Sequence, residues 1–253
     1  MMRVAALVLV GLAGFARPSQ ADYDAAAYRA SLARLDLERR ALARELRGAS
    51  GPDERAAVRR RARRLALESL DRVVFPAWMG TPWGMGPRSV ATEPHQLHRR
   101  VGCSAFVVAA LEDIGFRFER RTTFVRAPAL YIQQSLAPAP RDLHRYSNID
   151  PDRFAARVAA LGDGLYLVGL PNHIGFIEVA AGRAEMIHAG RTGPGTVQRE
   201  PVAIAPSVIA SRPSGYFVTP VLADDRLVDD WLLGRPVPFR PLSRLIAPAP
   251  SER

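Results

Sequence analysis

The sequence predicts an α+β domain, because helical patterns fill its first half and strand patterns fill its second. Apolar residues recur at helical spacing through residues 23–74 and 104–114. Short apolar runs bounded by turn residues then cover 164–170, 174–179 and 185–188. Strands that follow one another through short turns pair antiparallel, so we expect an antiparallel sheet with helices packed on it.

The N-terminal segment predicts a helical hairpin. Leu35 and Leu46 lie on one apolar stripe, the Gly- and Pro-containing residues 48–52 interrupt the pattern, and Val58 lies on a second stripe. We interpret the many arginines of both helices as a solvated face. The alternative is an arm that docks on a partner or on the cell wall.

The rest of the main domain is expected to mix irregular segments with short elements. Residues 75–100 are rich in Pro, Gly, Trp and His and predict an irregular segment. Further helices are expected near 128–137 and over 152–161, where Asp150 and Pro151 give an N-cap and a first-turn proline. Further strands are expected over 197–204 and 215–222.

The first 21 residues have the features of a secretory signal. A basic start precedes an apolar run over residues 4–16, which is too short to span a bilayer of about 30 Å. Ser19-Gln20-Ala21 then offers a small-x-small cleavage site. We therefore expect an exported protein, periplasmic or secreted; the alternative is an uncleaved anchor. The expected organisation is a signal peptide (1–21), a helical hairpin (22–75), the main domain (76–235) and a Pro-rich tail (236–253).

The net charge is +10, and the sequence contains arginine but no lysine. The arginines are dispersed, and no aromatic and basic recognition motif accompanies them, so we do not expect nucleic-acid binding. An anionic envelope polymer or a membrane surface fits an exported basic protein better.

Cys103 is the only cysteine, so it cannot form an internal disulfide. It follows Gly102 at the start of the expected helix over 104–114, where free backbone amides and the helix dipole stabilise a thiolate. The same first-turn amides could bind a developing oxyanion. The alternative is an inert buried cysteine.

Two histidines lie at strand ends. His173 opens one expected strand, and Gly175 on the same face leaves space beside the imidazole, where a thiol could approach. His188 ends the next strand, 15 positions later, where a hairpin could bring it beside His173 and fix the ring tautomer. Taken singly, both could be structural histidines.

Together these motifs resemble the NlpC/P60 family of cysteine peptidases. Family members carry D-C-S-G-F, a G-D-L-V-F-F strand, H-V-G-I-Y-I-G and often I-H-A, in that order. This sequence has G-C-S-A-F around Cys103, G-D-G-L-Y-L before the histidine, H-I-G-F-I from His173 and I-H-A around His188. The resemblance covers roughly residues 80–200.

The resemblance implies a papain-like α+β domain over 76–235, in which the helix with the cysteine packs on an antiparallel sheet. It implies that Cys103 is the nucleophile, His173 its base and His188 the third member of the catalytic set. The implied reaction is hydrolysis of an amide or peptide bond through a thiolate and a thioester, with peptidoglycan stem peptides as substrates. It requires no metal and no cofactor.

The sequence also departs from the family pattern. Gly102 replaces the usual Asp, and Ala105 the usual Gly. Trp83 stands where the family often has a Tyr near the oxyanion site, and its indole N–H can donate a hydrogen bond. We therefore place Trp83 and Ser104 at the oxyanion or substrate-binding site of a divergent member.

Two other functions remain open. His95 and His98 are three positions apart and could bind zinc in a zinc-dependent hydrolase, although their spacing matches no zinc signature. The other function is a non-catalytic envelope-binding module built on the same fold.

Overall fold

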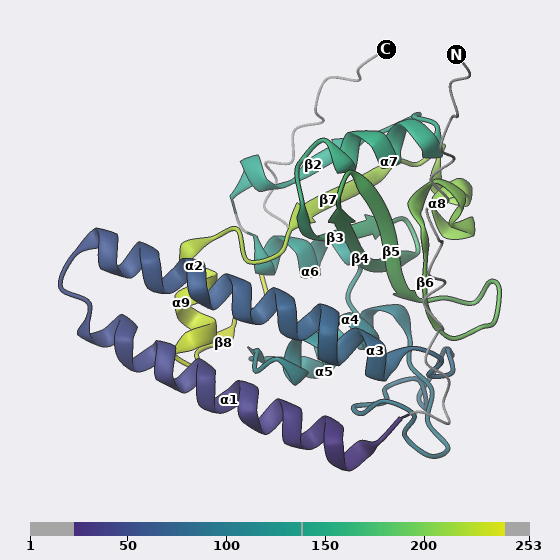
Figure 1. Ribbon diagram of the computed structural model, residues 1–253. Coiled ribbons are helices and arrows are strands. Elements are labelled where there is room, and N and C mark those ends of the chain that lie inside the picture. Colours follow the sequence, from purple (N-terminus) through teal and green to yellow (C-terminus); the bar gives the residue numbers. More distant parts are fainter. Residues whose placement is uncertain (1–22, 138, 241–253) are drawn as a thin grey trace, which may run out of the picture.

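The structure is a computed structural model that describes residues 23–137 and 139–240 (Figure 1). The expected signal peptide and the end of the expected tail lie outside these residues. Helices and an antiparallel sheet make up the described chain, so the α+β prediction is confirmed. No described helix is both long and apolar enough to cross a membrane.

A six-stranded sheet forms the centre of the domain, and all its pairings are antiparallel. Its order is β2 (His144–Tyr146), β7 (Tyr216–Pro220), β3 (Gly164–Leu170), β4 (His173–Ala180), β5 (Arg183–Ala189) and β6 (Val197–Pro201). Ala181 and Gly182 join β4 to β5 with φ of 50° and 72°, which is the two-residue turn that suits the twist of a hairpin. Strands β3, β4 and β5 follow one another along the chain and form two consecutive hairpins.

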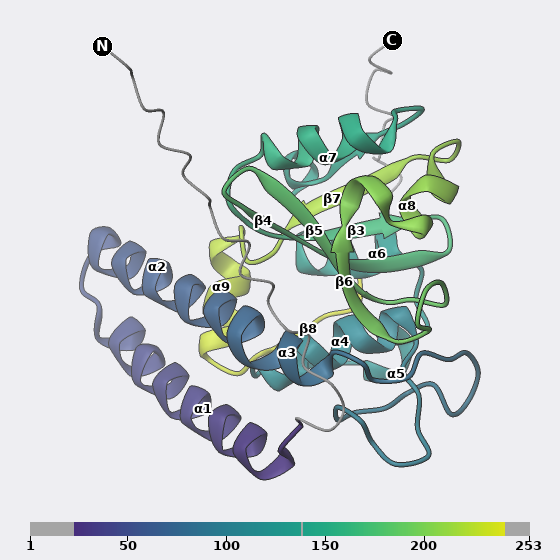
Figure 2. The same cartoon turned by 45° about the vertical axis from the view of Figure 1, so that its right-hand side comes forward.

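Helices lie on both faces of the sheet (Figure 2), and each face has its own apolar core. On one face, α4 (Cys103–Asp113) packs on β4, where Phe106 meets Phe176 edge-on at 6.0 Å between ring centroids. On the other face, Phe154 and Tyr216 stack at 4.1 Å. The second face is covered by α7 (Pro151–Ala159) and α8 (Pro206–Ser211). Because both faces of the sheet are covered, side chains on both sides of β3 are buried, which explains its continuous apolar sequence.

The expected N-terminal hairpin consists of α1 (Ala25–Gly48) and α2 (Pro52–Ser69). Helix α2 continues through a π-helical turn (Leu70–Val74) into α3 (Phe75–Trp78). The hairpin docks on α9 (Asp225–Leu232), where Arg59 donates to both carboxylate oxygens of Asp229 at 2.8 and 2.6 Å. Some of its arginines therefore hold it on the domain.

A buried carboxylate also joins the hairpin to the domain. Asp113, the last residue of α4, accepts hydrogen bonds from the Tyr28 hydroxyl at 2.6 Å and the Trp78 indole at 2.8 Å. Burial raises the pKa of Asp113 to about 6, although both hydrogen bonds oppose the shift. This contact links α1, α3 and α4.

The remaining elements are short. They are β1 (Arg117–Phe118), α5 (Arg121–Phe124), α6 (Ala129–Leu136), β8 (Pro236–Val237) and 3₁₀ turns at Pro140–Asp142 and Val202–Ile204. Strand β8 pairs parallel with β1, and Val237 is buried. The first residues of the expected tail are thus packed on the domain.

Candidate active site

The start of α4 presents Cys103 with free backbone amides. Gly102 is extended (φ −81°, ψ 164°), no side chain caps the helix, and the first intrahelical bond runs from Phe106 N–H to Gly102 O at 2.8 Å. The amides of Cys103, Ser104 and Ala105 therefore have no intrahelical acceptor. They can donate to an anion that forms beside the Cys103 thiol.

A neighbouring strap, residues 83–90, fixes this helix start. Gly102 N–H donates to Ser89 O at 2.9 Å, and Gly84 N–H donates to Val101 O at 3.2 Å. A Cβ at Gly84 would lie 2.8 Å from Arg100 Cβ, so a larger residue there would push the strap away from Arg100. The strap forms one wall of the cleft beside Cys103.

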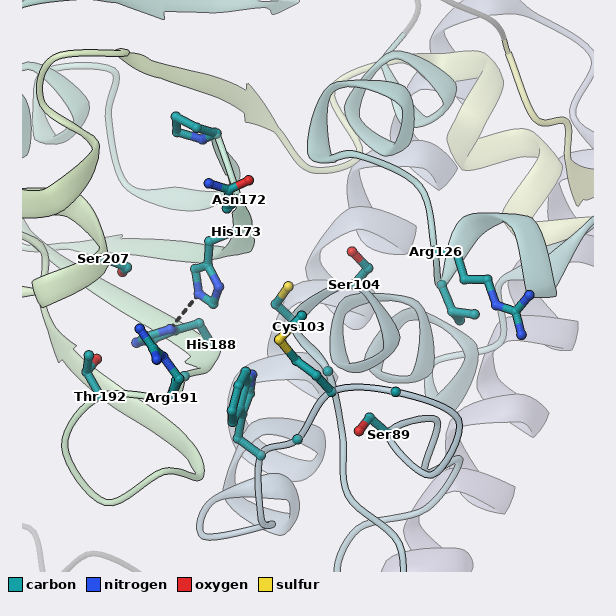
Figure 3. Close-up of a pocket in the computed structure, with 18 of the residues that line it drawn as sticks. Ser89, Cys103, Ser104, Arg126, Asn172, His173, His188, Arg191, Thr192 and Ser207 are labelled. Atoms are coloured by element: carbon teal, nitrogen blue, oxygen red, sulfur yellow. Dashed lines mark hydrogen bonds between the residues drawn. The ribbon is translucent and has the colours of Figure 1, made fainter.

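The cleft has a volume of about 1100 Å³ and lies between α4 and the sheet (Figure 3). Its lining comes from the strap, the start of α4, residues 125–126, the start of β4, the end of β5 and helix α8. Cys103 faces His173 across it, and His188 lies behind His173. Residues far apart in the sequence therefore meet in one cavity.

His173 and His188 are hydrogen-bonded. His173 Nε2 lies 2.7 Å from His188 Nδ1, and the two rings meet edge-to-face at 88°. The sequence-based expectation that the β4–β5 hairpin brings these rings together agrees with this geometry.

The chain of hydrogen bonds continues to Glu200, on β6. His188 is fully buried, and its Nε2 lies 2.9 Å from Glu200 Oε1. The Gln198 side-chain nitrogen lies 3.3 Å from the same His188 atom, but an amide nitrogen only donates, so it is no acceptor for a proton there. An ionised carboxylate only accepts hydrogen bonds, so Glu200 places the proton of His188 on Nε2. His188 Nδ1 then accepts from His173 Nε2–H, and this leaves His173 Nδ1 with a free lone pair.

His173 is held neutral. Burial first, and the neighbouring His188 second, lower the pKa of His173 to about 3. At neutral pH the ring is therefore uncharged, and the tautomer set by His188 leaves its Nδ1 unprotonated.

The Cys103 thiol is partly buried and free. Within residues 23–137 and 139–240, no hydrogen bond joins it to His173, although both side chains line the same cleft. Figure 3 shows the sulfur directed toward the sheet side, where His173 lies. The two side chains thus share the cleft without a hydrogen bond between them.

Gly175 has a different role from the one we expected. Its missing side chain makes room for His188, because a Cβ there would lie 2.8 Å from His188 Cβ and 3.0 Å from Ile187 O. The expectation that this space is open to an approaching thiol is wrong, since β5 fills it with His188 and the Ile187 carbonyl. Gly175 instead lets His188 lie across β4 and reach His173.

The two predicted oxyanion or substrate-binding residues both line the cleft. The Ser104 hydroxyl donates to Ala127 O at 3.3 Å, and the Trp83 backbone N–H donates to Gly195 O at 2.8 Å. The Trp83 indole N–H makes no hydrogen bond within the described chain. Ser104 thus tethers the helix start, and Trp83 keeps a donor for a ligand.

His95 and His98 lie on an irregular loop and have positive φ values of 51° and 56°. The His95 ring packs against Tyr23 at 5.2 Å, and burial lowers the pKa of His95. No group of three His, Cys, Asp or Glu side chains able to hold a metal occurs among the described residues. Neither histidine lines the cleft of Cys103.

Glu200 is the site residue that sequence reasoning did not find. It becomes recognisable only through the β5–β6 register, which pairs His188 with Gln198 and places Glu200 two residues further along β6. A glutamate two residues after a glutamine in a predicted strand does not by itself indicate a role in an active site.

Comparison with known proteins identified no relative. No family model, no curated protein and no solved structure matches the chain.

Proposed function

We propose that the protein is an exported cysteine hydrolase that cleaves an amide or peptide bond. The observation that carries this proposal is the hydrogen-bonded row His173–His188–Glu200, which ends on the cleft opposite Cys103. A structural histidine pair would not need to line a cleft opposite the chain's one thiol. A helix with a cysteine at its start, packed on an antiparallel sheet, is also what a papain-like domain of the NlpC/P60 type requires.

The first chemical step is attack by the Cys103 sulfur on the carbonyl carbon. His173 Nδ1 removes the thiol proton as the S–C bond forms, so the thiolate is generated during attack. The resulting imidazolium is stabilised through His188 by the negative charge of Glu200. His173 is the base, and His188 and Glu200 are positioning residues.

The oxyanion of the tetrahedral intermediate forms beside the start of α4. The free amides of Cys103 and Ser104 donate to it, with the Trp83 indole as a further donor. His173 then returns its proton to the leaving amine, which leaves an acyl thioester on Cys103. A water molecule, deprotonated by His173, hydrolyses the thioester and releases the acid.

The proposed substrate is a peptide of the cell envelope, with peptidoglycan stem peptides as the first candidates. The resemblance of the motifs and the expected signal peptide support this choice. A cleft of about 1100 Å³ is large enough for several residues of an extended peptide.

A non-catalytic envelope-binding module is the second candidate. The observation that favours it is the lack of a hydrogen bond between Cys103 and His173 in the described chain. In that case His173 would serve only to order the cleft.

Hydrolysis of purified muropeptides tests the proposal. The mature protein should release new amino and carboxyl ends, EDTA should have no effect, and iodoacetamide or Cys103→Ala should abolish the activity. Loss of activity with EDTA but not with iodoacetamide would establish a zinc mechanism instead. Intact muropeptides and no cleavage of a wider amide panel would favour the binding module.

A further inference from the structure

The two most exposed large apolar side chains of the described chain belong to one irregular segment beside the cleft. Met85 is 82% exposed and Leu97 is 80% exposed. Both lie in segment 83–100, which projects as loops next to α3 and α4 (Figure 2). The segment therefore presents to solvent the kind of side chain that most of the chain buries.

The surroundings of Arg100 bring these two side chains to one surface. A Cβ at Gly84, the neighbour of Met85, would lie 2.8 Å from Arg100 Cβ. Leu97 precedes Arg100 by three residues, which span at most about 11 Å. Met85 also lines the cleft, so this surface includes part of the cleft rim.

The same surface carries positive charge. Arg88, Arg99 and Arg100 are exposed, and Arg100 N–H donates to Arg88 O at 3.1 Å, so the three side chains leave neighbouring backbone. None of the three forms an ion pair within the described part of the chain. Glu93 is the only acidic residue in the sequence of the segment, and its carboxylate lies 3.9 Å from the guanidinium of Arg29.

Apolar side chains among unpaired arginines fit the surface of an anionic bilayer. Such side chains enter the boundary between headgroups and acyl chains, while arginines bind the lipid phosphates. A soluble anionic polymer would bind the arginines but leave the apolar side chains in water. A second copy of this chain, docked through the same face, would bring like charges together.

We propose that segment 83–100 docks on an anionic lipid bilayer. Met85 and Leu97 enter the interface, and the three arginines bind the headgroups. The cleft then opens beside the bilayer, because the strap belongs both to its wall and to the docking segment. The inference is independent of the proposed hydrolase function, since lipid binding requires no group of the candidate active site.

Sedimentation with vesicles tests the proposal. Protein without residues 1–21 is used, so that the apolar run over 4–16 cannot insert. We expect binding to vesicles of phosphatidylcholine with phosphatidylglycerol, weaker at about 0.5 M salt, and none to phosphatidylcholine alone. The double variant Met85→Ser, Leu97→Ser should lower the partition coefficient about 10-fold, and Arg99→Gln about 5-fold.

Matched controls lie at the other end of the molecule, around α7 (Figures 1 and 2). Ile204→Ser removes an apolar side chain that is 64% exposed, on the 3₁₀ turn that packs on α7. Arg153→Gln removes an exposed arginine of α7 itself. Both variants should bind vesicles like the wild type, and thermal unfolding checks that every variant is folded.

Trp83 provides a readout of where the protein touches the bilayer. Trp78 and Trp231 are fully buried, whereas Trp83 is partly exposed and lies two residues from Met85. Brominated acyl chains should therefore quench the emission of the wild type, and Trp83→Phe should remove this quenching.

The absence of binding to anionic vesicles would overturn the proposal. Binding that the double variant and Arg99→Gln leave unchanged would also overturn it. Binding to soluble polyglutamate without binding to vesicles would indicate a polymer partner instead. A dimer that Leu97→Ser dissociates, again without vesicle binding, would indicate a second copy of the chain.

Discussion

Replacing Glu200 by Gln removes the charge at the end of the His173–His188–Glu200 row while keeping the shape of the side chain. Glu200 Oε1 accepts from His188 Nε2 at 2.9 Å, and the His188 ring is fully buried. A hydrogen bond to a charged group contributes about 1.5–3 kcal/mol. If that energy supports mainly the imidazolium formed during attack, kcat should fall by about 10- to 150-fold.

KM should change little in this variant, because Glu200 does not line the cleft. A merely structural role would lower stability without changing the His188 tautomer, so nitrogen-15 NMR provides a second readout. We expect His188 Nε2 to lose its preference for the proton in Glu200→Gln.

Glu185→Gln is the matched control, since Glu185 on β5 pairs with Arg199 at 3.2 Å and lies outside the cleft. The control should keep near-normal kcat. The reasoning is refuted if Glu200→Gln turns over like the wild type, or if both variants lose activity equally.

Three further predictions concern the supports of the site. Gly175→Ala should displace His188, because the new Cβ would lie 2.8 Å from His188 Cβ; turnover should fall while iodoacetamide still labels Cys103. Because the pKa of His173 is lowered to about 3, the unfolded chain binds the proton more tightly. Acidification from pH 6.5 to pH 3 should therefore destabilise the wild type by at most about 5 kcal/mol, and His173→Gln should lack this contribution in denaturant titrations at each pH. The raised pKa of Asp113, about 6, has the opposite sign, since the folded state binds that proton more tightly. Raising the pH from 4 to 6 should thus destabilise the wild type by at most about 3 kcal/mol relative to Asp113→Asn in the same titrations, and a parallel pH dependence of the two proteins would contradict this.

Much of the fold could be predicted because local patterns and chain order agree. Strand β3 spans the predicted residues 164–170, since an apolar run lies between Gly164 and a turn at 171–172. Helix α9 was not predicted. Its stripe of Leu227, Val228 and Trp231 is short and lies among aspartates, and it becomes stable by packing beneath the hairpin.

The site could be predicted in part for the same reason. Cys103, His173 and His188 each stand at the end of an element, a position that sequence patterns reveal. The roles of Gly175 and Glu200 depend on strand register and on what crosses the neighbouring strand. Register is a long-range property, so local spacing indicated the wrong occupant for the space above Gly175 and gave no sign of Glu200.

The central claim is that Cys103 forms a thioester with the acyl part of the substrate. Intact-mass measurement of acid-quenched His188→Ala protein, incubated with muropeptides, tests it most directly, since weakened positioning of His173 slows hydrolysis of the thioester. We predict a mass increase equal to the acyl fragment, located on the peptide that contains Cys103 and absent after iodoacetamide treatment. Two results together would contradict the account: muropeptide cleavage that continues in fully alkylated wild-type protein, and no acyl adduct on Cys103 in the unalkylated protein.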